Sequence, residues 1–423
     1  MACLCSGVFA RGQSGSIVSR GPDLTVDLRR FGYQHLKPLK GHAGSGYYAL
    51  RNRLVLLDGG TVAVSFFVPK AAAVPAGPGE GAADGYTFET AFLDARTGRF
   101  VRVQQWPGAS YQCGPFPVPG GRFVIWHGLD LTLHALDGET VNTAAIDPDL
   151  SHFLGVTQSP SGKTLIAKSP YRQGEHVLCL SSSTLREIAR FDLRGATGSG
   201  SDSYVAAVRR QEGRETPFLK PVGGTEVVAY GPLTADARAR KLITVYKTAD
   251  RTFLPFVRFL DDHTLALSAG DRLDVLSLSG DELYALKADR GAVAGLTPCR
   301  DCDLVAFVTR TTKGGYALFD TFYLPGKVIE LVYILNLKTK RLVELASAGW
   351  ATWHPVAVYP ALALAPDGCT LAHQADWRLE IYRICGTEIG EQLGFEPGQQ
   401  RDGLVGTERP FERVPSLRRS AGD

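Results

Sequence analysis

The sequence predicts an all-β fold, a β-propeller of four-stranded antiparallel blades, with seven blades preferred and six or eight possible. One tight-turn motif recurs along the chain, the apolar segments have the length of strands, and amphipathic helical periodicity is absent. Glycine is abundant, with 47 residues among 423, which is typical of many short strands joined by tight turns. A ring of repeats can exceed the usual size of one domain, because each repeat packs mainly on its neighbours.

The recurring motif is clearest at residues 365–372, where the sequence reads APDGCTLA. A small apolar strand end leads into a tight turn that contains glycine, and a β-branched, apolar strand follows, as in a β-hairpin. Six weaker copies precede it, at residues 57–63, 118–124, 159–167, 222–228, 260–266 and 300–306. Successive copies lie roughly 40 or roughly 60 residues apart, and a unit of about 40 to 50 residues is the period of a propeller blade.

Four strands can be assigned to the first unit, at residues 53–57, 61–68, 86–93 and 100–105. We name the strands of a blade a to d, from the centre outwards. A tight c–d turn is expected at residues 95–98. Further units follow near residues 113–146, 152–192, 216–252, 254–287 and 292–346, and the 216–252 unit fits the pattern least well.

The seventh unit lacks an outer strand, since only residues 361–365, 370–373 and 378–384 have strand character. Residues 24–28 alternate between apolar and polar and supply a spare strand near the N-terminus. Pairing of this strand with the last blade would close the ring and remove an open edge. The expected organisation is therefore a disordered segment at 1–22, the propeller at 23–385 and an irregular or disordered tail at 386–423.

The long insertions are all expected on one face of the propeller. They are expected between strands b and c at residues 69–85, 233–240 and 310–327, and between blades at residues 106–111, 194–203 and 347–354. In a meander both kinds of connection emerge on the same face, whereas the a–b and c–d turns lie on the opposite face. Loops on a rigid scaffold often carry function, although insertions can also be merely tolerated there.

Composition limits the functional classes. The net charge of +3 gives no large basic field, so no nucleic acid partner is expected. No apolar run approaches the roughly 20 residues of a membrane span, so no membrane span is expected. The protein is expected to be a monomer. Residues 1–10 do not resemble a secretory signal, but a start placed too late would look the same, so the compartment stays open. The spacing of the eight cysteines does not define a disulfide framework.

The turn at residues 366–372, and in weaker form the turn at 160–167, resembles the repeat of bacterial WD40-like β-propellers, the group that includes the propeller of TolB. The resemblance spans roughly residues 50 to 385 and implies a seven-bladed propeller that serves as a binding or interaction module. No unit ends in the Trp-Asp pair of true WD40 repeats.

Motifs that would indicate catalysis are absent. Cys299 and Cys302 form the one C-x-x-C, which lacks a second ligand pair for zinc, so a hairpin-tip disulfide or two thiols are expected. The sequence contains no H-E-x-x-H, G-x-S-x-G or phosphate-binding glycine loop. A propeller hydrolase of lactonase type remains the alternative, with a site at the mouth of the central channel. His152, Glu215 and His354 could contribute to such a site.

The aromatic residues favour a binding role instead. They concentrate in segments assigned to blades six, seven and one, which neighbour each other in a closed ring, and aromatic clusters often form interaction hot spots. The predicted binding residues are Trp106, Tyr111, Tyr316, Phe319, Phe322, Tyr323, Trp350, Trp353 and His354. The same side chains could also pack the insertions against each other. The sequence therefore predicts a non-enzymatic scaffold that binds a protein or a small ligand on its loop-bearing face, without a cofactor or metal.

Overall fold

The computed structural model describes most of the strand-forming chain. The described residues are 16–18, 20–31, 53–69, 86–106, 114–127, 130–145, 155–171, 174–193, 196–210, 224–233, 237–248, 255–313, 317–318, 322–323, 327–345, 350–352, 361–375 and 378–396. All statements below about absence or number refer to these residues.

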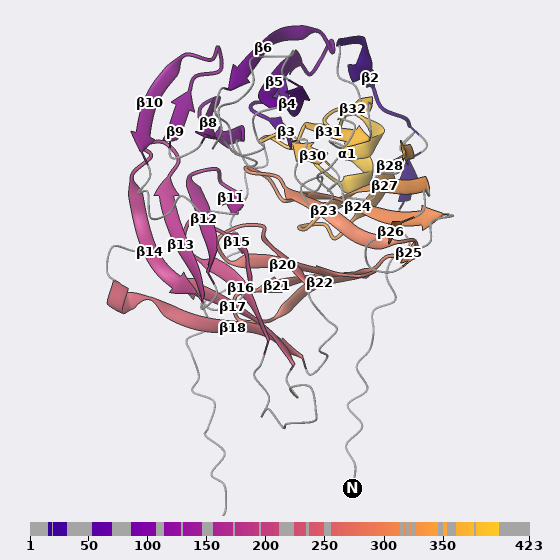
Figure 1. Cartoon of the computed structure of the whole chain (residues 1–423). Helices are drawn as coiled ribbons and strands as arrows, with labels where there is room; N and C mark the ends of the chain where they lie inside the picture. The colour runs from indigo at the N-terminus through magenta and orange to yellow at the C-terminus, as the bar shows by residue number, and fades with distance from the viewer. Residues whose placement is uncertain are drawn as a thin grey trace, which may run out of the picture.

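Seven antiparallel sheets are arranged around one axis, which confirms the predicted seven-bladed propeller (Figure 1). Blade one consists of β3 (Arg53–Leu56), β4 (Thr61–Pro69), β5 (Tyr86–Asp94) and β6 (Phe100–Trp106). Blade two consists of β7 (Phe116–Val118), β8 (Arg122–His127), β9 (Asp130–His134) and β10 (Thr140–Ala145). Blade three consists of β11 (Gly155–Gln158), β12 (Thr164–Tyr171), β13 (Gly174–Ser181) and β14 (Glu187–Leu193). Blades four and five are β15 (Ala196–Gly200), β16 (Val205–Arg210), β17 (Thr225–Gly231) and β18 (Lys241–Thr248); and β19 (Phe256–Phe259), β20 (Thr264–Ala269), β21 (Arg272–Ser277) and β22 (Glu282–Lys287).

The last two blades contain additional elements. Blade six consists of β23 (Ala292–Pro298), β24 (Leu304–Lys313), β27 (Lys327–Asn336) and β28 (Leu342–Leu345), joined by β1 (Ser16–Val18) and β29 (Trp350–Thr352). Blade seven consists of β30 (Ala361–Leu364), β31 (Thr370–Ala375), β32 (Arg378–Arg383) and β2 (Leu24–Asp27).

The hydrophobic core is divided among the interfaces between blades. Buried apolar side chains of the described residues form seven clusters, and each cluster joins two neighbouring blades. The middle strands are buried on both faces, as the run Val62, Ala63 and Val64 in β4 illustrates. The cluster of blades seven and one includes Leu28 and Leu54, so the last blade packs on the first and the ring is closed.

The predicted closure by an N-terminal strand is confirmed. Strand β2 pairs antiparallel with β32, and Leu24 lies opposite Ile381. The backbone N–H of Arg383 also donates to the carboxylate of Asp23 over 2.7 Å. The strand therefore supplies the outer edge that the last blade lacks, and Leu28, directly after it, is completely buried.

The strands of blade four lie at other residues than the sequence predicted. The segment 194–203, expected to be a loop between blades, contains the inner strand β15, and its true a–b turn follows at residues 201–204. The turn expected at 222–228 instead leads into strand c, β17. Residues 233–240, expected between strands b and c, connect c to d and contain a short 3-10 helix at Ala237–Ala239, so this insertion emerges on the opposite face.

The ends of the propeller also differ from expectation. Within the predicted disordered segment 1–22, β1 pairs in parallel with β28 at the outer edge of blade six. Within the predicted irregular tail, helix α1 (Glu388–Leu393) ends at Gly394, which has the left-handed conformation. Its buried side chains Ile389 and Leu393 belong to the cluster between blades six and seven. The apolar side of helix α1 therefore packs against the propeller.

Candidate functional site

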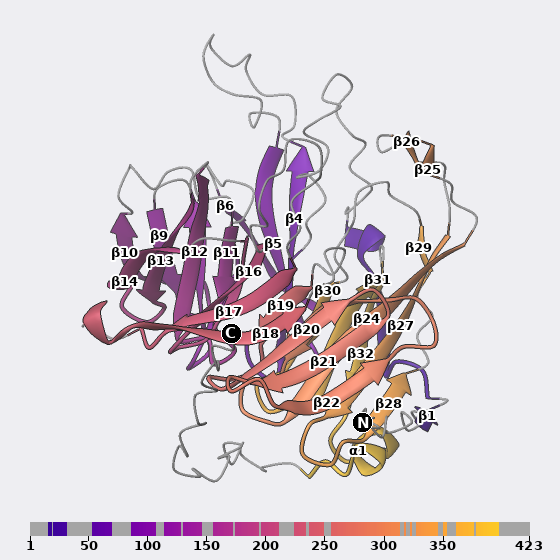
Figure 2. The same ribbon diagram turned by 90° about the horizontal axis from the view of Figure 1, so that it is seen from below.

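Blade six extends beyond its neighbours at the loop-bearing end. Strands β24 and β27 pair along ten residues, and β29 pairs with the first three residues of β27, so that Trp350 lies opposite Ile329. Between β24 and β27 a small hairpin forms from β25 (Ala317–Leu318) and β26 (Phe322–Tyr323). We call β25, β26, β29 and the paired ends 311–313 and 327–329 the blade six extension. It places a b–c insertion and a connection between blades at the same end of the sheet, as predicted for this blade (Figure 2).

The structure places three of the predicted binding residues on this extension by their backbone. Phe322 and Tyr323 form β26, and Trp350 begins β29. Five more of the predicted binding residues lie outside the described residues: Tyr111, Tyr316, Phe319, Trp353 and His354. His354 was also a candidate for a lactonase-type site, and the other two candidates for that site, His152 and Glu215, lie outside the described residues as well.

Trp106 is not a surface residue, and its assignment to the binding face is wrong. Its side chain is only 5% exposed and packs between blades one and two, edge-on against Phe123. The indole N–H donates to the hydroxyl of Thr90 over 2.9 Å. Trp106 is the last residue of β6, and the burial pattern of this strand turns it inwards. A buried indole with a satisfied N–H is a core element rather than a binding anchor.

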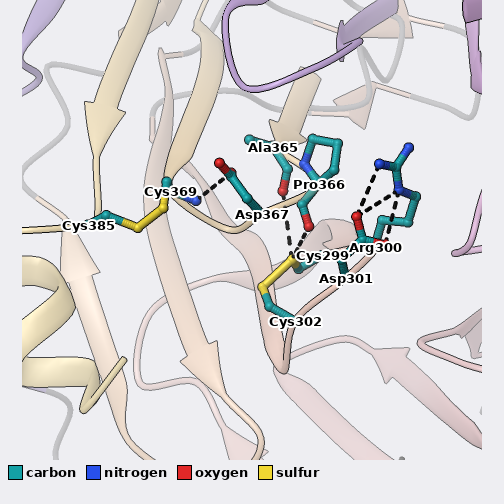
Figure 3. Close-up of a disulfide and its surroundings, with 9 residues drawn as sticks. All are labelled: Cys299, Arg300, Asp301, Cys302, Ala365, Pro366, Asp367, Cys369 and Cys385. Atoms are coloured by element: carbon teal, nitrogen blue, oxygen red, sulfur yellow. Dashed lines mark hydrogen bonds and ion pairs between the residues drawn. A yellow bond between two sulfur atoms is a disulfide. The ribbon is translucent and has the colours of Figure 1, made fainter. Parts of the chain in front are cut away.

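Two disulfides mark the opposite end of blades six and seven (Figure 3). Cys299 and Cys302 pair across the a–b turn of blade six, which agrees with one of the two alternatives left by the sequence. Cys369 and Cys385 pair between the start of β31 and the residue beyond β32. The turn of Pro366 lies against the first disulfide, because Cys299 Sγ is 3.1 Å from the carbonyl oxygen of Pro366. The two bridges therefore lie on either side of the same junction, one within blade six and one within blade seven.

Helix α1 covers this junction. Ile389, Leu393 and Phe395 pack on the cluster that includes Cys299 and Cys302. The carbonyl of Leu393 accepts hydrogen bonds from the amide of Asn336 over 3.1 Å and from the hydroxyl of Thr339 over 2.8 Å. The helix after the last strand is thereby fixed to the c–d turn of blade six.

A chain of buried polar groups crosses the same interface closer to the extension. Arg310 on β24 donates to Glu330 on β27 over 2.6 Å, and Glu330 lies 3.0 Å from Nε2 of His373 on β31. The other ring nitrogen of His373 lies 3.2 Å from Glu380 on β32, which also accepts from the Tyr382 hydroxyl over 3.0 Å. His373 and Glu380 are completely buried and Glu330 is 2% exposed.

Burial and neighbouring charges shift the pKa values of His373 and Glu330 in opposite directions. Burial alone would lower the pKa of His373, but its hydrogen bonds to Glu330 and Glu380 and their charges raise it above the usual value. Burial would likewise raise the pKa of Glu330, yet the hydrogen bond from His373 and the charge of Arg310 lower it. The arrangement therefore favours a protonated imidazole between two carboxylates.

In the described part of the chain, no group of three or more His, Cys, Asp or Glu side chains has the geometry to hold a metal ion. No helix there is long and apolar enough to cross a membrane.

Several solved structures resemble this chain at low sequence identity. No protein-family model matches the sequence, and no curated protein matches it. Solved structures that match include Sqt1 from Chaetomium thermophilum, with a TM-score of 0.42 and 13% identity over 79% of this chain and 97% of that chain. The β-propeller domain of the Trilobed protease from Pyrococcus furiosus matches with a TM-score of 0.44 and 9% identity, over 82% and 98%. Kluyveromyces lactis Hsv2 gives 0.41 and 11%, over 76% and 89%. At these TM-scores the likeness adds nothing to the seven-bladed β-propeller that the strand pairing of the chain itself shows.

Proposed function

We propose that this protein is a non-enzymatic binding scaffold whose protein partner docks on the blade six extension. The observation that supports this most directly is the pairing of β29 with β27, which joins two separate insertions in one sheet. A loop that is ordered into strands presents its residues on a rigid support, and sites on rigid elements hold their geometry best.

The aromatic content of the extension supports a protein partner. Phe322, Tyr323 and Trp350 lie on its strands, and aromatic anchors carry much of the binding energy in protein interfaces. The remaining predicted residues of the same segments, Tyr316, Phe319, Trp353 and His354, belong to the proposed surface, and Tyr111 extends it towards blade one. A kinship with TolB-type bacterial propellers also stays a prediction.

The two disulfides also indicate the kind of compartment in which the protein works. Disulfides persist in oxidising environments and are rare where thiols are kept reduced. Two bridges within one junction therefore support a scaffold that works outside the reducing cytosol.

Site-specific photo-crosslinking tests the docking surface. A photoreactive residue in place of Phe322 or Trp350 should capture one and the same protein from an extract of the source organism. The control position is Lys338 in the c–d turn at the opposite end of blade six, which should not capture it. With the purified partner, Trp350→Ala should weaken binding by about 2 kcal/mol or more if it is a central anchor, whereas Arg96→Ala in the c–d turn of blade one should leave the affinity unchanged. Equal capture from position 338, or an unchanged affinity of Trp350→Ala, would reject the surface.

A further inference from the structure

Arg258 lies in β19, the innermost strand of blade five, and its side chain faces blade six. It pairs with Ala266 of β20. Ala266, and Leu260 two residues beyond Arg258, belong to the apolar cluster between blades five and six. Residues directly opposite each other in a sheet share a face, as do residues two apart in a strand, so Arg258 points towards the same interface.

The same position in the two neighbouring blades carries a hydroxyl that reaches the next inner strand. Ser199 in blade four and Thr297 in blade six also lie opposite an alanine of strand b. The hydroxyl of Ser199 accepts from the backbone N–H of Phe259 over 3.1 Å, and that of Thr297 donates to the carbonyl of Leu362 over 3.2 Å. Each hydroxyl therefore bonds two blades together near the axis, and Arg258 stands where blade five would make the corresponding bond.

The guanidinium of Arg258 makes no such bond in the described part of the chain. Its Nε is buried and has no hydrogen-bond partner. Burial lowers the pKa of Arg258, and no carboxylate of the described residues offsets this effect. The group still carries its charge, because arginine stays protonated in proteins. The side chain as a whole is half-buried, so solvent reaches part of it and a small solute can do the same.

The inner strand of blade six, on the other side of this interface, contains a bulge. The register of β23 with β24 shifts between Ala294 and Thr297, which leaves Gly295 and Leu296 without partners in the ladder. Gly295 has a φ of +60°, in the left-handed region. Leu296 belongs to the same apolar cluster as Ala266. Bulges interrupt the pairing of a strand and are frequent next to binding sites.

We propose that Arg258 anchors a binding site for a small oxyanion, a carboxylate or phosphate group, between the inner strands of blades five and six. A cation enclosed beside apolar side chains without a counter-charge is unfavourable, and an anion that pairs with it removes the penalty. Arginine binds both kinds of oxyanion through paired N–H donors. Ser268, which is two residues from Ala266 on the same face of β20, adds a hydroxyl to this side of the blade.

The oxyanion would connect blades five and six as the hydroxyls of Ser199 and Thr297 connect their own neighbours. The site lies on inner strands, whereas the proposed docking surface lies on insertions of blade six, so neither depends on the other. A ligand that binds only the folded ring stabilises it, and its binding can therefore be measured through unfolding.

Titration of the full-length protein with inorganic phosphate and, separately, with acetate tests the site. In chloride buffer at constant ionic strength, the midpoint of thermal unfolding should rise with the concentration of one probe or both. A rise with phosphate alone identifies a phosphate ligand, and a rise with acetate alone identifies a carboxylate. Arg258→Met should weaken binding about 10- to 100-fold, the effect of losing hydrogen bonds to a charged group.

The matched control is Arg272→Met in strand c of the same blade. Arg272 already donates to the buried carboxylate of Asp274 over 2.8 Å. The control should therefore keep the response to the probe but unfold at a lower midpoint than the parent, because it leaves that carboxylate unpaired. Arg258→Met removes a cation without a counter-charge, so without probe its midpoint should equal or exceed that of the parent.

Two results would overturn the site. One is a parent protein whose midpoint responds to neither probe, or a response that Arg258→Met retains in full. The other is a clear loss of stability of Arg258→Met in the absence of probe, as in the control, because the guanidinium would then already have a stabilising partner within the protein.

Discussion

Blades three and four meet mainly through apolar side chains, whereas the apolar interface of blades six and seven also contains buried charges and has a disulfide in each blade. At the first interface Ile166, Val177 and Val205 are essentially inaccessible to solvent. Cys179 lies among them as a free thiol, and burial raises its pKa to about 12. Polar contacts join the adjacent a–b turns, where the Asp202 carboxylate accepts from the hydroxyl of Ser161 over 2.6 Å and of Thr164 over 3.0 Å.

The two interfaces also differ in the length of the chain segment that connects their blades. Strand β14 ends at Leu193 and β15 begins at Ala196, so connectivity alone keeps blades three and four together. Strand β28 ends at Leu345 and β30 begins at Ala361, a longer connection whose closure costs more entropy. Both ends of the propeller also meet at blades six and seven, as β1, β2 and α1. Apolar packing and the hydrogen bonds of Asp202 join the first interface, while the second adds ion pairs to its apolar packing and has a disulfide in each of its blades.

The largest effect is expected from removing the closing strand. Deletion of residues 1–28 removes β2 and the buried side chains of Val26 and Leu28. Their burial is worth about 3 to 6 kcal/mol together, and the exposed edge of β32 would invite association. Denaturant unfolding and size-exclusion chromatography should show lower stability and oligomers. Deletion of residues 1–15, which keeps β1 and β2, is the control. A 1–28 deletion that stays monomeric and melts within about a degree of the parent would refute closure by β2.

Reducing agent should distinguish the two interfaces. It should lower the stability of the parent because the Cys369–Cys385 bridge closes a loop of 16 residues, which corresponds to about 3 kcal/mol. Cys369 and Cys385 are half-buried, whereas Cys299 and Cys302 are buried, so alkylation and mass spectrometry should find the first bridge reduced earlier.

The double variant Cys369→Ser with Cys385→Ser provides the control, since its stability should respond less to the reductant than that of the parent. Cys179→Ala, which alters the apolar interface, should keep the full response. If reduction of the parent leaves its unfolding midpoint unchanged, the bridges are not needed at this junction.

The fold was predictable because turn chemistry repeats in the sequence. The a–b turns are correctly placed in six of the seven blades, four of them with a glycine in the turn, and the unpaired last blade correctly predicts β2. Blade four was misplaced because β15 reads ATGSG, which has one β-branched residue and none of the large apolar residues of a typical strand. The structure gives the reason, since Gly200 lies so close to Ile166 that a larger residue would not fit.

The sites were less predictable, because they depend on register between strands. Cys369 directly precedes strand b and Cys385 follows strand c, and with Thr370 opposite Arg383 the register brings Cys369 opposite Ile384, one residue from Cys385. His373 and Glu380 are opposite each other in the same hairpin, so that pair was also accessible from the expected strands. The bond to Glu330 was not, because it joins different blades. Trp106 was misread because a residue at a strand end can face either the core or the loop.

The smallest effect is expected at the apolar interface, and it should depend on volume alone. A Cβ atom at Gly200 would lie 2.8 Å from Cδ1 and 2.9 Å from Cγ1 of Ile166. Gly200→Val should therefore cost about 1 to 3 kcal/mol, as overpacking does, and Ile166→Ala should restore part of the loss in the double variant. Gly21→Val is the control, since nothing lies within 4 Å of a Cβ atom there. The cost measured by denaturant unfolding should be the same at neutral and alkaline pH and with or without reductant, because the contact of Gly200 with the Ile166 side chain involves neither a charged group nor a disulfide. A cost that changes with pH or reductant would show that the two interfaces are not independent, and the contrast between them would fail.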